Sequence, residues 1–393
     1  MALPRLPAVQ KLLRRPKPGS GDFSWDLEEY VPGNKLTLFF RGEDLYAAMA
    51  TAIEEAKETV NLETYIFGGD KTGRAFADLL MRAAKRGVRT RLIYDSVGSL
   101  DLTPEMETLM RNAGVQILEY HPVAPWRPRW SWNKRAHRKI LICDGKIGFV
   151  GGMNLCDDHA PKSAGGNDWP DAHARVEGPA AYDLDRLFRS VWHGETGRWF
   201  DSSGHPELTR GAAAVKIVGN HELLRRFVIR ETYVNALRAA KTDVAIANSY
   251  FIPDWRIRRS LAQAVRRGVS VRVLVPGLSD IRSVWHSMRA HYDSLLVRGV
   301  RVFEWQGPMM HAKAVVVDGR WCAVGSYNLD HRSLRHNLEV NLQTCDADFA
   351  AELKARFELG VAGAREITLA DWRRRPWTER ALEKFWSSFD YFF

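Results

Sequence analysis

The stretch His311-Ala312-Lys313-Ala314-Val315-Val316-Val317-Asp318-Gly319, followed by Gly325-Ser326-Tyr327-Asn328, determines the fold expected for this 393-residue chain. A second copy occurs upstream at His137-Arg138-Lys139-Ile140-Leu141-Ile142-Cys143-Asp144-Gly145 and Gly151-Gly152-Met153-Asn154. His, Lys, Asp, Gly and Asn have the same spacing in both copies, and the two histidines lie 174 residues apart. Such a repeat indicates a chain built from two related halves.

Each copy also predicts a β-hairpin. An apolar run ends at Asp-Gly, which favours a tight turn between antiparallel strands. His and Lys are two residues apart on the incoming strand, so their side chains point to the same face. After the hairpin, Gly-Gly or Gly-Ser lets the backbone approach a ligand closely, and Asn154 or Asn328 adds a side-chain amide. We therefore expect each copy to supply half of one site.

The segments around the two copies predict strands and helices in the same order. In the first half they are strand 36–40, a helix from 43, strand 59–67, a helix ended by Lys85-Arg86-Gly87 and strand 88–94; in the second half they are strand 215–218, helix 227–237, strand 244–247, a helix ended by Arg266-Arg267-Gly268 and strand 269–275. This order predicts an α/β fold of two duplicated α-β-α halves with mixed sheets, related by a pseudo-twofold axis, with the site at their interface.

We divide the chain into four parts. They are a basic flexible tail at 1–20, a first half at 21–208, a second half at 209–365, and a basic and aromatic C-terminal segment at 366–393. The tail is interpreted either as simply disordered or as an electrostatic attachment to an anionic membrane surface.

Composition narrows the partners without selecting one. The formal net charge of +10 favours nucleic acid, acidic lipid or a phosphorylated small molecule. No run of about 18 apolar residues is present, so we expect no transmembrane helix. The four cysteines lack metal-ligand spacing, and we expect them to be reduced core residues of a cytosolic protein.

The loop Pro122–Trp132, just before His137, combines aromatic residues with cations. The loop Ser163–Pro170, after Asn154, and the C-terminus Phe385–Phe393 carry further aromatic residues. Each has two interpretations, because indoles and cations suit both ordinary packing and contact with lipid headgroups. For the C-terminus the alternative to headgroup contact is a docked terminal helix.

The repeated residues together suit a tetrahedral phosphodiester. We expect Lys139, Lys313, Asn154 and Asn328 to hold its non-bridging oxygens, with support from Gly152 and Ser326. One histidine attacks phosphorus while the other protonates the leaving oxygen. We expect no metal site and no cofactor.

The two imidazoles need opposite protonation states at the start, which an ordinary pKa of about 6.5 makes accessible near neutrality. A carboxylate on the far ring nitrogen would fix each ring. Within each half the candidates are Asp171 for His137 and Glu339 for His311. Asp144 and Asp318 belong to the repeated signature and are counted with the catalytic set, although holding the hairpin suits them better than proton transfer.

The doubled pattern His-x-Lys-x4-Asp-x6-Gly-(Gly/Ser)-x-Asn resembles the phospholipase D superfamily over roughly residues 35–360. The resemblance implies phospholipase D-like halves and a metal-independent, two-step displacement through a phosphohistidine. His137 is then the nucleophile, and His311 is the general acid and later the base.

Finer features resemble the bacterial cardiolipin synthases, in particular the type without N-terminal transmembrane helices. They are His137–Ile140, Gly151–Asn154, Asp171–His173 with Glu177–Pro179, Tyr250–Pro253, Asn328–Ser333, Asn337 and Glu339. Trp169-Pro170-Asp171 departs from the family pattern, which more often has arginine in the middle.

The function implied is a cardiolipin synthase-like phosphatidyltransferase. It would join two phosphatidylglycerols, or phosphatidylglycerol and another alcohol, and release glycerol. We expect a cytoplasmic protein bound peripherally to the inner face of the cell membrane, with no nucleic acid and no obligate protein partner. The alternatives are a phospholipase D-type hydrolase, in which water is the acceptor, and a nuclease of the same superfamily, which the basic charge also suits.

Overall fold

The computed structural model describes residues 16–23, 29–124, 126–127, 130–131, 133–202, 209–220 and 227–393. The strands of this part of the chain are β1 (Val31–Phe39), β2 (Thr59–Thr64), β3 (Arg89–Asp95), β4 (Gln116–Tyr120), β5 (Arg135–Ala136), β6 (Ile140–Cys143), β7 (Ile147–Gly151), β8 (His173–Glu177), β9 (Ala213–Gly219), β10 (Asp243–Asn248), β11 (Ser270–Pro276), β12 (Arg301–Trp305), β13 (Lys313–Val317), β14 (Trp321–Gly325), β15 (Asn337–Leu338), β16 (Val340–Thr344) and β17 (Ala364–Ile367). The α-helices are α1 (Gly42–Glu55), α2 (Lys71–Lys85), α3 (Pro104–Asn112), α4 (Ala180–Thr196), α5 (Val228–Ala239), α6 (Trp255–Arg266), α7 (Arg282–Ala290), α8 (Tyr292–Leu296), α9 (His331–Arg335), α10 (Ala347–Ala362), α11 (Leu369–Arg373) and α12 (Trp377–Ser387).

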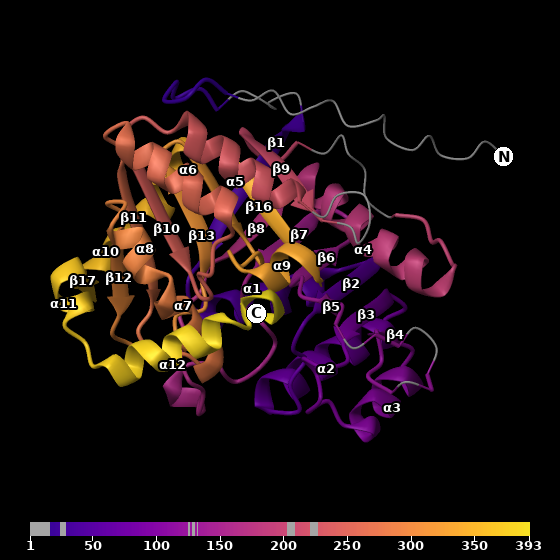
Figure 1. The fold of residues 1–393 in the computed structure, drawn as a ribbon. Coiled ribbons are helices and arrows are strands. Elements are labelled where there is room, and N and C mark those ends of the chain that lie inside the picture. The colour runs from indigo at the N-terminus through magenta and orange to yellow at the C-terminus, as the bar shows by residue number, and fades with distance from the viewer. Residues whose placement is uncertain are drawn as a thin grey trace.

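A 15-stranded mixed sheet runs through the described part of both halves (Figure 1). Outward from its centre, the first half has the order β1-β8-β7-β6-β2-β3-β4. The second half has the order β9-β16-β14-β13-β10-β11-β12-β17. Apart from β17, each strand has its counterpart in the other half, which confirms the predicted duplication. Antiparallel pairing of β1 with β9 joins the two half-sheets edge to edge.

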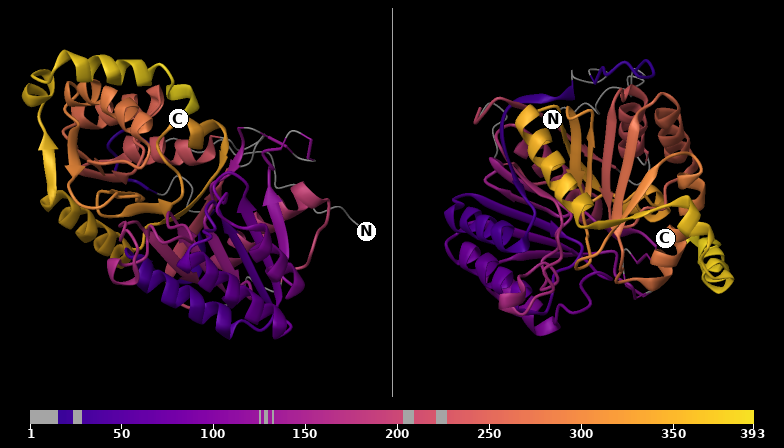
Figure 2. Two further views of the ribbon diagram at one scale, coloured as in Figure 1. Left: turned by 90° about the horizontal axis from the view of Figure 1, so that it is seen from below. Right: turned by 90° about the vertical axis from the view of Figure 1, so that its left-hand side faces the viewer.

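Helices cover both faces of this sheet (Figure 2). On one face, α4 and α10 pack over a core that contains residues of both halves, such as Leu38 of the first and Val316 of the second. On the other face, α1 and α2 cover a core of the first half and α5 and α6 a core of the second. Because the α4–α10 core crosses the seam, the two halves are packed as one body.

Helix boundaries follow local sequence signals. The predicted stops are confirmed at Gly87 and Gly268, which follow α2 and α6 and each have φ +87°. Glycine adopts this left-handed conformation without the steric cost of a side chain. At the other end of the same helices, the carboxylates of Asp70 and Asp254 accept N–H groups of the first turn. The two helices therefore begin and end by the same devices, as expected of a duplicated unit.

The terminal segments both attach to the second half. Gly19 and Gly21 donate their N–H groups to carbonyls of α5, so residues 16–20 of the predicted tail are held in place; residues 1–15 lie outside the described residues. At the other end, β17 pairs with β12. Arg289 of α7 binds Glu383 of α12 at 3.2 Å, which confirms a docked terminal helix. The predicted boundary at 208/209 adjoins residues that the structure does not describe, and the four-part division stays a prediction.

Two further expectations concern membranes and cysteines. Among the described helices, none combines the length and apolar character needed to cross a bilayer. Cys143, Cys156 and Cys322 are free and buried, as predicted. Cys345 is free but exposed, so its assignment to the core was wrong. It follows the last residue of β16, where the chain leaves the sheet and turns towards α10.

Candidate active site

One backbone hydrogen bond to the opposite half positions each histidine. The N–H of His137 donates to Leu338 O at 3.0 Å, and the N–H of His311 donates to Pro170 O at 2.9 Å. These carbonyls belong to the residues that precede Glu339 and Asp171. The first contact continues the parallel pairing of β5 with β15. Each histidine is thereby brought beside a carboxylate of the other half.

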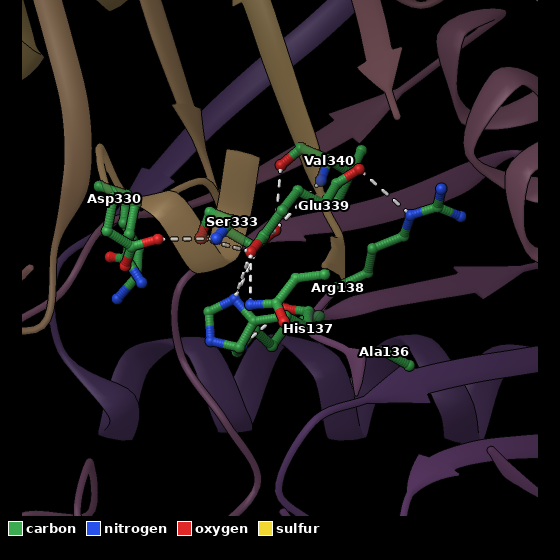
Figure 3. A network of polar contacts seen from close by, with 12 residues as sticks. Ala136, His137, Arg138, Asp330, Ser333, Glu339 and Val340 are labelled. Carbon is green, nitrogen blue, oxygen red and sulfur yellow. Dashed lines mark hydrogen bonds and ion pairs between the residues drawn. The ribbon is translucent and has the colours of Figure 1, made fainter. Parts of the chain in front are cut away.

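The side chains complete this crossed arrangement, and Figure 3 shows its His137–Glu339 pair. The Nδ1 atom of His137 lies 2.9 and 3.0 Å from the carboxylate oxygens of Glu339. The Nδ1 atom of His311 lies 2.8 Å from Asp171 Oδ2. Assigning the proton to Nδ1 leaves the Nε2 lone pair of each ring available for chemistry. Each predicted carboxylate lies on a histidine ring, but the predicted pairing was wrong, because the segments that carry the carboxylates pair across the interface rather than within a half.

The two carboxylates differ in their surroundings. Glu339 accepts hydrogen bonds from Ser326 Oγ, from Ser333 Oγ at 2.7 Å and from Asn337 Nδ2 at 3.2 Å (Figure 3). Burial alone would raise the pKa of Glu339, but His137, Lys139 and these donors hold it below the usual value. Glu339 is therefore a firmly ionised group.

Asp171 has fewer donors. Within the described residues it accepts only from the N–H of Ala172, at 2.6 Å, and from His311. Burial raises the pKa of Asp171, and Lys313 is the largest opposing influence. The carboxylate behind His311 is thus less strongly held in its charged form than the one behind His137.

The histidines themselves are buried, and this changes their titration. Burial lowers the pKa of His137 to about 4, with Glu339 opposing the shift. Burial, Lys313 and Lys139 lower the pKa of His311 well below its ordinary value. Burial therefore favours the neutral form of both rings in the empty site, against the expectation that both forms are equally accessible near neutrality. An anionic phosphodiester between them would favour the imidazolium and restore an acid.

The lysines and asparagines surround the same space. Lys139 Nζ donates to His137 O at 2.7 Å, and Lys313 Nζ donates to His311 O and to Ser249 Oγ at 2.9 Å. Asn154 Oδ1 and Asn328 Oδ1 both accept hydrogen bonds, the latter from Ser249. Because each side-chain oxygen is engaged, each amide NH₂ is left as a donor. The structure thus brings together the two histidines, lysines and asparagines that the sequence predicted.

The affinity of this site for an oxyanion such as tungstate is expected to fall as the pH rises above about 7. Burial lowers the pKa of Lys139 to about 7 and that of Lys313 to about 8, so both lose protons in the empty site. A bound dianion raises both pKa values, and binding then takes up protons. Kd should rise up to about tenfold per pH unit for each deprotonated lysine.

Titration calorimetry in two buffers of different ionisation enthalpy measures this proton uptake directly. A Kd that is constant between about pH 6 and about pH 9 would contradict the assignment of the two lysines to the anion site.

Asp144 and Asp318 lie at the opposite end of the strands that carry the lysines. Asp144 follows Lys139 by five positions, which corresponds to about 16 Å along a strand. Asp144 accepts the N–H groups of Lys57, Glu58 and Thr59, and Asp318 accepts the equivalent groups before β10. These contacts join each hairpin turn to the residues where the neighbouring strand begins. We therefore propose a structural role for Asp144 and Asp318 in place of the predicted catalytic one.

Asp144→Asn is accordingly expected to lower the free energy of unfolding by about 2 kcal/mol, because three hydrogen bonds lose a charged acceptor. Asparagine tolerates the positive φ of +53° at this position, so backbone strain does not confuse the result. Thermal melts and kcat measured well below the transition separate stability from catalysis, with Asp318→Asn as the matched variant. A loss of more than about tenfold in kcat in a folded protein would contradict the structural role.

Gly152 and Ser326 lie against the two carboxylates. A Cβ atom at Gly152 would lie 2.4–2.7 Å from the carboxyl group of Asp171, so a side chain there would displace it. Ser326 occupies the equivalent position in the second copy and donates to Glu339. Their predicted support of the phosphate stays a prediction.

Two tyrosines were missed from the sequence. The Tyr65 ring lies 5.0 Å from the His137 ring, and the Tyr250 ring lies 6.2 Å from the His311 ring, between centroids. Lys139 Nζ is 5.1 Å from the first ring and Lys313 Nζ is 6.0 Å from the second. Both tyrosines follow a strand that pairs with a motif strand, β2 with β6 and β10 with β13. Their location within two residues of the ends of these strands was the available signal.

His159 is the other missed residue, and it belongs to the one set of described side chains that could hold a metal ion. His159, Asp171 and His311 each place a ligand atom within 4.8 Å of the others. His159 follows Asn154 by five residues, as Ser333 follows Asn328, and its ring centroid is 5.6 Å from that of His311. An ion bound there would compete with the proton that His311 must carry, so we derive no catalytic step from it.

Comparison with known proteins agrees with this geometry. The family model described as "Cardiolipin synthase, PLD-like domain" matches residues 49–167 and 233–359, one match around each motif copy. The chain belongs to this family. The cardiolipin synthase of Alkalihalophilus pseudofirmus is 33% identical over 346 residues, which cover 87% of this chain and 69% of that protein. Cardiolipin synthase A of Pseudomonas putida is 34% identical over 348 residues, covering 87% and 72%.

Solved structures share the fold. A phosphatidylserine synthase from Haemophilus influenzae superposes with a TM-score of 0.67 at 12% identity, covering 90% of this chain and 93% of that one. A polyphosphate kinase from Porphyromonas gingivalis reaches 0.60 at 13% identity, covering 91% and 53%. Together the comparisons confirm the predicted superfamily, the fold class and a phosphatidyltransferase of the phospholipase D superfamily.

Proposed function

We propose that this family member joins two phosphatidylglycerol molecules into cardiolipin and releases glycerol. The observation that carries the proposal is the crossed pair of imidazoles. His137 and His311 come from different halves, each has Nδ1 on a buried carboxylate, and two buried lysines lie beside them. Such a set can attack phosphorus from one side and protonate the leaving oxygen on the other.

In the first step, His137 Nε2 attacks the phosphorus of one phosphatidylglycerol. The P–N bond forms as the bond between phosphorus and the headgroup glycerol oxygen breaks, and His311 donates its proton to that oxygen. Lys139 and Lys313 stabilise the charge on the non-bridging oxygens. Glu339 stabilises the cationic ring of the phosphohistidine, since its carboxylate stays ionised.

In the second step, a hydroxyl of another phosphatidylglycerol attacks the same phosphorus. His311 now accepts the hydroxyl proton, and the P–N bond breaks to regenerate neutral His137. Water in place of the hydroxyl would give phosphatidic acid through the same residues. His137 and His311 are only 7% and 5% exposed, which limits the access of water and favours the alcohol.

Peripheral attachment to an anionic membrane is part of the proposal. Trp126, 85% exposed, and Trp130 precede β5, which leads into His137. The exposed Tyr391 near the C-terminus packs on His336, with ring centroids 5.6 Å apart. Asn133, which follows the Pro122–Trp132 loop, lies at hydrogen-bond distance from His336, with 3.0 Å between the nitrogens. The two aromatic segments thus meet beside the site, and aromatic side chains with cations suit the headgroup region. The inner face of the cell membrane is the surface we propose.

Product analysis tests the function. Purified protein is incubated with phosphatidylglycerol vesicles, with and without EDTA, and the lipids are read by mass spectrometry. We expect cardiolipin and glycerol in equal amounts and essentially no change on chelation. Phosphatidic acid without cardiolipin would identify a hydrolase, and cleavage of an oligonucleotide without lipid turnover would identify a nuclease.

A further inference from the structure

An apolar cavity of about 140 Å³ lies between α10 and the sheet of the second half and is partly open to solvent. Figure 2 shows α10, the golden-yellow helix of the right-hand view, lying across these strands. The cavity lining is almost wholly aliphatic or aromatic. It includes Ala245, Ala247, Ala312, Ala314, Leu353 and Phe357.

Small side chains create this space. Ala247 pairs with Ala314 in the register of β10 and β13, and Ala245 lies on the same face two residues earlier. On the helix side, Gly360 also lines the cavity, and a Cβ atom there would lie 2.6 Å from Leu274 Cδ2. Methyl groups on the sheet and a bare backbone on the helix leave room that larger residues would fill.

The first half has no such row of small residues at the equivalent positions. The N–H groups of Asp144 and Asp318 donate to the carbonyls of Thr59 and Asp243, so Asn61 and Glu63 correspond to Ala245 and Ala247. Asn61 there binds Asp185 of α4 at 2.8 Å. Burial raises the pKa of Glu63 to about 7. The apolar hollow is thus a feature of the second half rather than a consequence of the fold.

The cavity lies next to the catalytic residues. Pro170 and Asp171, which hold the backbone and ring of His311, also line the cavity. Met310 and Ala312, the neighbours of His311 in sequence, line it as well. Because alternate residues point to opposite sides, a single backbone layer separates the imidazole from the hollow.

The opposite end of the lining reaches the molecular surface. It includes Leu359, which is 64% exposed, and Arg356. The guanidinium of Arg356 lies 5.4 Å from the centroid of the Phe40 ring, another lining residue. The hollow therefore has one end beside the residues that hold His311 and another end at the molecular surface.

We propose that this cavity binds one acyl chain of the phospholipid whose phosphate occupies the catalytic site. The inference rests on the proposed function and extends it to chain recognition. An apolar cavity of similar volume holds benzene, so the space takes about six carbon atoms, part of a chain rather than the whole. The aliphatic lining excludes headgroups and water alike.

Filling the cavity tests the proposal. Ala247→Leu is compared with Ala355→Leu, an exposed alanine on α10 that does not line the hollow. Each variant is assayed on dihexanoyl and dioleoyl phosphatidylglycerol, relative to wild type on the same lipid. We expect Ala247→Leu to lower kcat/KM for the dioleoyl lipid at least tenfold more than for the dihexanoyl lipid, and Ala355→Leu to leave the ratio unchanged.

A second variant guards against a folding defect. Ala247→Val fills part of the same space with a smaller side chain, and its β-branched residue suits a strand. Unchanged lipid ratios in both variants, with native melting curves, would overturn the proposal. Absence of transfer by wild type on either lipid would instead overturn the proposed function.

Photocrosslinking locates the chain itself. Phosphatidylglycerol with a diazirine at the end of one acyl chain is expected to label peptides that contain Ala245–Ala247 or Leu353–Gly360. Tungstate bound in the catalytic site should suppress this label, because the phosphate and chain belong to one molecule. If a diacylglycerol with the same diazirine labels these peptides equally well whether or not tungstate is bound, the cavity binds a membrane lipid other than the substrate. That result would overturn the proposal.

Discussion

His137→Ala is expected to lower kcat for phosphatidyl transfer by about 10⁵-fold or more, because it removes the atom that forms the covalent bond to phosphorus. Folding should be nearly unaffected. Glu339 retains its hydrogen bonds from Ser326, Ser333 and Asn337, so its charge stays satisfied in the variant. Turnover of phosphatidylglycerol followed by mass spectrometry, with a thermal melt of the same preparation, measures both.

His311→Ala is the matched comparison. With phosphatidyl-p-nitrophenol the leaving group departs without a proton, so this variant should release about one equivalent of nitrophenolate in a burst and then stop. His137→Ala should give no burst. A burst from His137→Ala and none from His311→Ala would reverse the two roles.

Glu339→Gln is expected to lower kcat by about 10³–10⁴-fold, because an amide replaces the carboxylate that fixes the catalytic imidazole. The amide NH₂ can donate to His137 Nδ1, which places the ring proton on Nε2 and removes the attacking lone pair. Steady-state turnover of phosphatidylglycerol measures the loss, and circular dichroism and melting check the fold.

Leaving-group dependence then tests the crossed pairing. Asp171 holds His311, so the deficit of Asp171→Asn should shrink with phosphatidyl-p-nitrophenol. The deficit of Glu339→Gln should persist, because Glu339 holds His137. The opposite pattern would show that each carboxylate serves the histidine of its own half.

Much of the fold was predictable because its sequence signals occur in two copies. The Asp-Gly turns, the glycine helix stops and the order of strands each occurred in two copies, so the duplicated α/β halves followed from sequence. The joining of the half-sheets through β1 and β9 could not be predicted, because edge pairing depends on contacts between segments more than 170 residues apart.

The site was predictable as a set of residue types but not as a set of pairs. His137, His311 and the two carboxylates were identified from the sequence. Their pairing was not, because it arises from backbone hydrogen bonds to Leu338 and Pro170, which each lie in the half opposite to the histidine. Burial of the imidazoles was equally invisible, and it lowers the pKa of both. Tyr65, Tyr250 and His159 lie outside the repeated pattern, which explains their omission.

The central claim is that the two halves form one site in which the first half supplies the nucleophile. Locating the trapped phosphatidyl group on the chain tests this claim directly. His311→Ala is mixed with phosphatidyl-p-nitrophenol, digested at alkaline pH and analysed by peptide mass spectrometry. The predicted result is one phosphatidyl group on the peptide that contains His137. A phosphatidyl group on His311 in the reciprocal His137→Ala experiment, with none on His137, would contradict it.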